Sequence, residues 1–231
     1  MKKKLVIGLA PLLVTAVFAA RPGTAQAVPH WTVNGSLATS APVLVKASGV
    51  LSLVVVKGGV PGAFVTCAIA EVGTINNPTS GAGVDAPLVM FAFAAHPTTS
   101  GLGCESQSVC PAADRTDVTP YSTAGTSSYF LDWGSILEPS GAQIRDKITG
   151  INLKIDCVKN AAIDSSIIFV GATAPLCLHG TSALHPGFLE WAAGSGELEV
   201  QGSGGAVTAD IEGAVQMLGY EENELINCRS T

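Results

Sequence analysis

Strict alternation of apolar and polar residues is the feature that most constrains the fold of this chain. Side chains of a β-strand point alternately to opposite faces, so a period of two predicts a strand with one buried face. Residues 151–157 and 207–217 follow this period, and 197–201 form a shorter example. The inward-facing sets are Ile151, Leu153, Ile155 and Cys157, and Val207, Ala209, Ile211, Val215 and Met217.

Other short segments are apolar on both faces, namely 50–56, 88–95 and 167–170. Such runs are typical of central strands that are covered on both sides. Turn residues separate the segments, and Asn34-Gly35 is a strong signal for a two-residue hairpin. We therefore predict an all-β fold, an antiparallel sandwich or barrel of roughly nine to eleven strands with little helix.

Longer loops are predicted at about 75–86 and 97–127, and single helical turns are expected at 132–137 and 185–191. No linker, low-complexity tract or repeat of fixed period divides the chain. Residues 28–231 are accordingly predicted to form a single β domain.

The first 27 residues have the layout of a secretory signal peptide. Three lysines precede an apolar run, Leu5 to Ala20, and Ala25-Gln26-Ala27 supplies the small residues of a cleavage site. The run is short for the ~30 Å hydrocarbon core of a bilayer. We therefore expect cleavage after Ala27, a secreted mature protein, and no integral membrane association afterwards.

The expected mature chain is acidic. Four of the 12 basic residues lie in the leader, which leaves eight against 18 acidic residues, a net charge of −10. A surface of this charge repels phosphate groups, so nucleic acid and anionic membranes are poor candidate partners.

Six cysteines lie in the mature part, and an even number in an exported chain favours disulfides. No CxxC pair is present, which argues against a zinc site and a thioredoxin-like redox site. The predicted disulfide residues are Cys67, Cys104, Cys110, Cys157, Cys177 and Cys228.

Six cysteines allow 15 pairings. A bridge between Cys104 and Cys110 closes a short loop and contributes about 2.4 kcal/mol in the chain-entropy treatment, whereas bridges from these cysteines to Cys67 and Cys157 contribute about 4 kcal/mol each. Because Cys67 and Cys157 lie in apolar strands and the other two share one loop, that loop can be fastened to both strands. We prefer Cys67–Cys104, Cys110–Cys157 and Cys177–Cys228.

Several stretches resemble a paralogous group of uncharacterised secreted β-rich proteins of high-GC Gram-positive (actinobacterial) soil bacteria. They are VTCAIAEVGTINNP (65–78), CESQSVCP (104–111), IRDKITGINLKIDCV (144–158), TSALHPGFLEWAAGSGELE (181–199) and GGAVTADIEGAVQMLGYEENELI (204–226). The resemblance implies an exported β-rich domain and no particular activity. Cys177 and Cys228 are additional to the cysteines usual in that group, which supports pairing them with each other.

Catalytic signatures are missing from the sequence. The context of Ser182 lacks the second glycine of a nucleophile elbow, and no Walker A loop, HExxH helix or EF-hand loop occurs. We predict no cofactor and favour a protein that is not an enzyme.

Three weaker hypotheses concern particular side chains. His179 and His185 could ligate a metal if a third ligand converged on them. A pair among Asp85, Asp132, Glu190 and Glu212 could hydrolyse glycans. Phe188 and Trp191 could stack together on a sugar ring, although large aromatic residues usually pack in a core.

These observations favour a non-catalytic extracellular or envelope-associated binding or structural module with a cell-surface or glycan partner. The alternatives are a secreted hydrolase that acts on glycans through paired carboxylates, and a carrier of a small apolar ligand. The high apolar fraction motivates the carrier, because apolar residues can line a cavity as well as a core.

Overall fold

The computed structural model describes residues 27–95, 103–111, 114–121, 131–159, 162–182, 184–194, 196–221 and 224–231, with the side chains of 162–165, 196 and 197 excepted. The predicted signal peptide covers residues 1–27, of which 1–26 lie outside the described residues, and it stays a prediction.

The described chain is built from fifteen β-strand segments in two sheets. The larger sheet contains twelve of them. These are β3 (Val43–Lys57), β4 (Val60–Asn76), β5 (Val84–Ala94), β6 (Glu105–Gln107), β7 (Arg115–Pro120), β8 (Gly134–Ser140), β9 (Gln143–Lys159), β10 (Ala162–Thr173), β11 (Leu176–Leu178), β12 (Phe188–Trp191), β13 (Gly196–Val200) and β14 (Val207–Gly219). The smaller sheet contains β1 (Pro29–Val33), β2 (Ser36–Leu37) and β15 (Ile226–Ser230).

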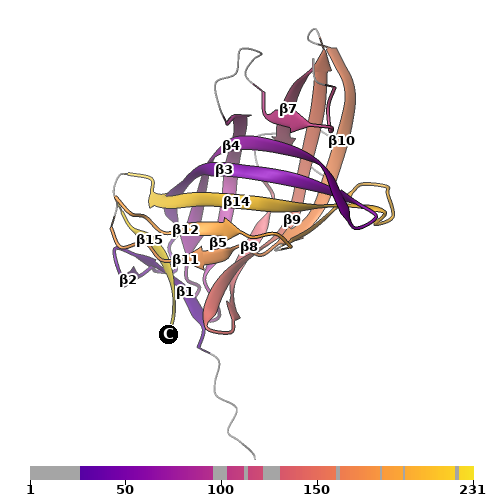
Figure 1. Cartoon of the computed structure of the whole chain (residues 1–231). Helices are drawn as coiled ribbons and strands as arrows, with labels where there is room; N and C mark the ends of the chain where they lie inside the picture. The colour runs from indigo at the N-terminus through magenta and orange to yellow at the C-terminus, as the bar shows by residue number, and fades with distance from the viewer. Residues whose placement is uncertain are drawn as a thin grey trace, which may run out of the picture.

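The larger sheet closes into an antiparallel barrel with eight strand positions (Figure 1). Its ring of hydrogen-bonded neighbours runs β3, β4, β5, β8, β9, β10, β13 and β14, and returns to β3. β11 and β12 bridge β9 and β14 farther along the same edges, and β6 and β7 extend the pairing of β4 and β9. The predicted all-β antiparallel architecture is confirmed, and the number of segments exceeds the predicted range because several barrel positions are shared by two short strands.

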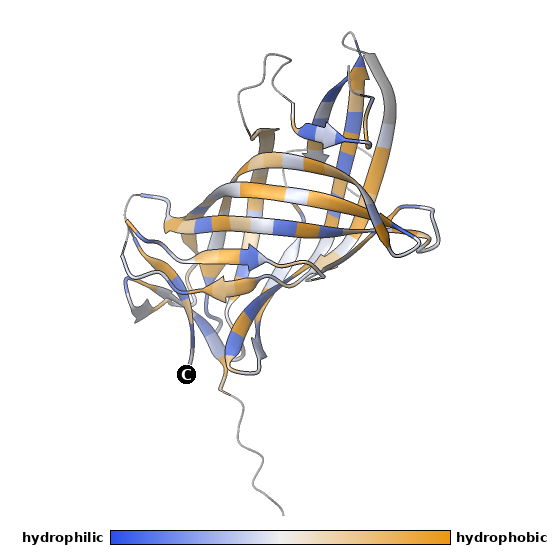
Figure 2. Cartoon of the chain, in the orientation of Figure 1, coloured by the Kyte–Doolittle hydropathy of each residue, from blue (hydrophilic) through white to orange (hydrophobic). Residues whose placement is uncertain are grey.

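Alternation along the long strands fills the barrel. On β9, Ile151, Leu153, Ile155 and Cys157 are buried, as the period of two predicts, and on β14 Ala209, Ile211, Val215 and Met217 are buried. Figure 2 shows β3 and β4 as mainly hydrophobic ribbons, whereas β9 alternates between hydrophilic and hydrophobic residues.

The outward-facing side chains of the segments that are apolar on both faces are more exposed than expected. On β5, Leu88, Phe91 and Phe93 are 40%, 47% and 45% exposed, and Val50 on β3 is 45% exposed. The prediction that 50–56 and 88–95 are covered on both faces is wrong for these side chains. A barrel wall is a single layer, so only the inward-facing half of each run is covered by the core.

The two predicted helical turns are also wrong. Residues 134–140 form β8 and residues 188–191 form β12, each paired with neighbouring barrel strands. The predicted loop at 97–127 contains β6 and β7, whose short polar sequences give no strand pattern. Tertiary pairing decides the conformation of such short segments.

The small sheet covers the end of the barrel where β4 ends and β5 begins. Asn34 and Gly35 join β1 to β2 with φ angles of 51° and 80°, the left-handed pair that a two-residue hairpin of this type requires. Trp31 on β1 is completely buried, and the Gly83 N–H donates to the Pro29 carbonyl (2.8 Å). The predicted hairpin is confirmed, and it helps to close one end of the barrel.

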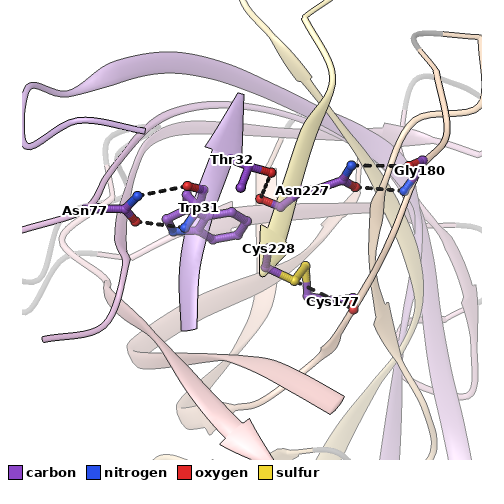
Figure 3. The surroundings of a disulfide bond; sticks show 7 residues. All are labelled: Trp31, Thr32, Asn77, Cys177, Gly180, Asn227 and Cys228. Carbon is purple, nitrogen blue, oxygen red and sulfur yellow. Dashed lines mark hydrogen bonds between the residues drawn. A yellow bond between two sulfur atoms is a disulfide. The ribbon is translucent and has the colours of Figure 1, made fainter. Parts of the chain in front are cut away.

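Two asparagine side chains and a disulfide hold this end sheet in place (Figure 3). The Asn77 side chain accepts from the Trp31 N–H (2.8 Å) and donates to the Trp31 carbonyl (2.9 Å). Asn227 makes the same two kinds of bond with Gly180, and Cys228 on β15 is bonded to Cys177 on β11. The covalent and hydrogen-bonded links connect the end sheet to the barrel wall.

All six cysteines form disulfides, and the pairing is Cys67–Cys104, Cys110–Cys157 and Cys177–Cys228, as predicted. Cys104 and Cys110 belong to one loop, and each reaches a different barrel strand, β4 or β9. Such a framework is typical of proteins from oxidising compartments. Across the described ranges, no helix is long and apolar enough to cross a bilayer.

Candidate functional site

The barrel encloses a cavity of about 90 Å³. Apolar side chains from nearly every barrel position form most of its wall. They include Val45, Leu51, Leu53, Ile69, Met90, Ile148, Ile151, Leu153, Leu189, Ile211, Val215 and Met217. This volume is far larger than one water needs and smaller than the roughly 150 Å³ of a cavity that holds benzene.

Two carboxyl groups face this cavity from neighbouring strands. Glu71 lies on β4 in the inward-facing phase that also contains Ile69 and Ile75, and Asp85 lies near the start of β5. Both residues line the cavity, and both are half-buried. The wall is thus acidic on one side.

A third carboxyl group lies beside them without reaching the surface. Asp146 on β9 is completely buried, and its Oδ1 accepts a hydrogen bond from the Ser135 hydroxyl on β8. Asp85 is within hydrogen-bonding reach of both Ser135 and Asp146. Four successive positions of the barrel wall, β4, β5, β8 and β9, therefore contribute one polar residue each to a single cluster.

Burial makes these carboxyl groups hard to ionise. It raises the pKa of Glu71 to about 8, and the charge of Asp85 adds to that effect. Burial also raises the pKa of Asp85 to about 6, although hydrogen bonds from Ser135 and Asp146 oppose the rise. The pKa of Asp146 is raised well above its ordinary value by burial first and by Asp85 second. Desolvation without a compensating cation is the common cause.

Two tryptophans also line the cavity, Trp133 and Trp191. Trp191, at the end of β12, is 6% exposed, and its indole N–H has no hydrogen-bond partner among the described residues. A buried donor costs free energy unless a protein group, a water or a ligand accepts its hydrogen bond.

Of the four acidic residues considered as a hydrolytic pair, only Asp85 lies at this site. Asp132 is exposed, and Glu190 and Glu212 lie at outward-facing positions between buried neighbours on β12 and β14. Glu71 and Asp146 were missed. The sequence does carry a sign that both carboxyl groups face the interior. Each lies at an inward-facing position of an alternating strand, and the neighbouring inward-facing residues are apolar.

The proposed stacking pair is wrong. Phe188 and Trp191 lie three residues apart on the same strand, and odd spacing directs side chains to opposite faces. Trp191 points into the barrel, whereas Phe188 lines a shallow outer hollow with Ser48 and Gln216. They cannot stack on one sugar ring.

His179 and His185 are both exposed, and His185 contacts the Ser182 hydroxyl (Nδ1 to Oγ, 3.4 Å). His96 lies outside the described residues. Within the part of the chain that the structure describes, no group of three histidine, cysteine or acidic residues is arranged to hold a metal ion.

Comparisons of the chain with protein-family models, with curated proteins and with solved structures found no match.

Proposed function

We propose that the protein is an exported, non-catalytic binding protein that carries a small, largely apolar ligand inside its barrel. The observation that carries this proposal is the cavity inside the barrel, whose described wall is mostly apolar and carries a few polar groups. Ligand sites generally combine these two properties, and eight-stranded barrels have an interior of the right size for one small ligand.

A glycan hydrolase receives less support from the same residues. Carboxyl pairs with separated pKa values occur in glycoside hydrolases, and Glu71 and Asp85 form such a pair. However, a sugar ring with its hydroxyl groups is larger than benzene, and the cavity of about 90 Å³ is smaller than a benzene site. The enclosed volume therefore favours a carrier of a compact molecule.

Export is part of the proposal. It is supported by the three disulfides and by the leader-like first 27 residues. N-terminal sequencing of the protein from culture medium is expected to begin at Val28.

The carrier function can be tested on protein purified from the medium of its own cells without organic solvent. Small molecules released on denaturation are identified by mass spectrometry and compared with those from an Ala47→Phe variant. Ala47 lines the cavity on β3, so a phenyl group there fills the space. The wild-type protein is expected to release a compound that the filled variant lacks. Identical releases from both proteins, or none from either, would reject the proposal.

A further inference from the structure

The polar groups of the cavity define what kind of ligand fits it. Glu71 and Asp85 line the cavity, and none of the described lining residues is lysine, arginine or histidine. One oxygen of Asp85 and one of Asp146 are buried without a hydrogen-bond partner among the described residues. The interior therefore contains carboxyl groups that can become negatively charged. Among the described lining side chains there is no cation to pair with them.

Trp191 supplies an independent observation on the facing wall. It reaches the cavity from β12. Counted either through β8, β9 and β11 or through β4, β3 and β14, β12 is the fourth strand from β5. Its indole N–H is buried, and none of the described residues accepts a hydrogen bond from it. A ligand that satisfies the cavity must therefore offer a donor on the side of the carboxyl groups and an acceptor toward Trp191.

A cation on the ligand satisfies the carboxyl side better than a neutral donor. A buried carboxylate is costly unless a positive charge and hydrogen bonds accompany it. An ammonium group supplies one charge and three donors, and its bonds to carboxylates are stronger than those between neutral groups. A metal ion would supply charge too, but the described residues hold no cluster with suitable geometry.

We propose that the ligand is a small amine, bound with its ammonium group at Glu71 and Asp85 and with an acceptor oxygen at the Trp191 indole. This inference rests on the proposed carrier function. Ser135 and Asp146 act as positioning residues, because they hold the Asp85 side of the cluster from β8 and β9.

Three isosteric probes test the proposal by calorimetric titration at pH 8.5: methoxyethylamine, methoxyethanol and butylamine. Methoxyethylamine has both groups, methoxyethanol lacks the charge, and butylamine lacks the ether oxygen. The amine with the ether is expected to bind about tenfold or more tightly than either of the others, given the strength of charged hydrogen bonds.

Single-residue variants test which side chains cause each binding preference. Glu71→Gln and Asp85→Asn are expected to reduce the preference for methoxyethylamine over methoxyethanol to about twofold or less. Trp191→Phe is expected to remove the preference over butylamine while keeping the preference over methoxyethanol. Glu212→Gln makes the same chemical change on the outer face of β14 and is expected to bind like the wild type.

The outcomes separate the two proposals. If methoxyethanol binds as tightly as methoxyethylamine, the amine inference is wrong and the carrier function stands. If no probe binds the wild-type protein, the amine inference is wrong, and the carrier function is decided by the comparison of released compounds with the Ala47→Phe variant. Circular dichroism spectra of the variants, compared with the wild type, establish that a lost preference comes from a folded barrel.

Discussion

Asp85 and Trp191 line one cavity from strands that are four positions apart in both directions round the barrel. Among the described residues, one buried oxygen of Asp85 has no donor and the buried N–H of Trp191 has no acceptor. The cavity wall thus includes two residues with unpaired buried polar atoms, and apolar side chains form most of the rest.

Neutralising Glu71 should change how stability depends on pH. Its pKa is about 8 in the folded protein, against an ordinary value of 4.5. The folded state therefore holds a proton that the unfolded state has lost, and the free energy of unfolding falls as pH rises between these values. The slope is at most about 1.4 kcal/mol per pH unit for one proton. Glu71→Gln is expected to flatten this dependence and to be more stable than the wild type at pH 8, as measured by urea unfolding across pH.

Glu212→Gln serves as the control for that series and should keep the wild-type dependence on pH, because Glu212 lies on the outer face of β14. A wild-type stability that does not fall between pH 5 and pH 8 would contradict the assigned environment of Glu71.

Ser135→Ala removes the hydroxyl that donates to Asp146. The fully buried carboxyl group of Asp146 then loses the hydroxyl that donates to it, and the expected loss in the free energy of unfolding is about 1–3 kcal/mol. Urea unfolding at neutral pH measures it. Ser36→Ala on the exposed strand β2 is the matched control, with an expected change within about 0.5 kcal/mol. Equal effects at the two serines would refute the role of the Ser135–Asp146 bond.

Replacing Cys177 and Cys228 together by serine opens a bridge that spans 51 residues. The chain-entropy treatment predicts a loss of about 4 kcal/mol, measured by guanidinium unfolding. Because the same bridge holds the end sheet, hydrogen exchange at the Gly180 N–H, which is bonded to Asn227, should also become faster. A loss below about 1 kcal/mol with unchanged exchange would show that the asparagine contacts suffice.

Affinity for methoxyethylamine should rise with pH. Binding an ammonium group requires ionised carboxyl groups, and those that line the cavity have pKa values of about 6 for Asp85 and about 8 for Glu71. Asp146 lies behind them, and the facing strands β3, β12 and β14 add no titratable group to the lining. Titrations are expected to show weak binding near pH 5.5 and tight binding near pH 8.5. Binding that is independent of pH would oppose an ionic contact.

Much of the fold follows from local patterns. Alternation in 151–157 and 207–217 predicts the strands that became β9 and β14, and Asn34-Gly35 predicts its hairpin. Two of the three disulfides follow from placing two cysteines in a loop and two in apolar strands, whereas the pairing of Cys177 with Cys228 was supported by the resemblance to the secreted group. In contrast, β8 and β12 were misassigned because strands of seven and four residues take their conformation from pairing with distant segments.

The site was only partly accessible to sequence reasoning. Asp85 could be considered, but its convergence with Glu71 and Asp146 depends on which strands become neighbours when the barrel closes. Glu71 and Asp146 are 75 positions apart in the sequence. The pairing of β4 with β5 and of β8 with β9 helps to bring them together. Alternation shows that these acids face inward, and only the topology shows that they face one another.

The most direct test of the account is a ¹³C NMR titration of the Glu71 side-chain carboxyl in the protein without and with saturating methoxyethylamine. The account predicts a pKa near 8 in the ligand-free protein and a lower value in the complex, because the ammonium group stabilises the carboxylate. A ligand-free value near the ordinary 4.5, unchanged by the amine, would place Glu71 in contact with bulk water and contradict the account.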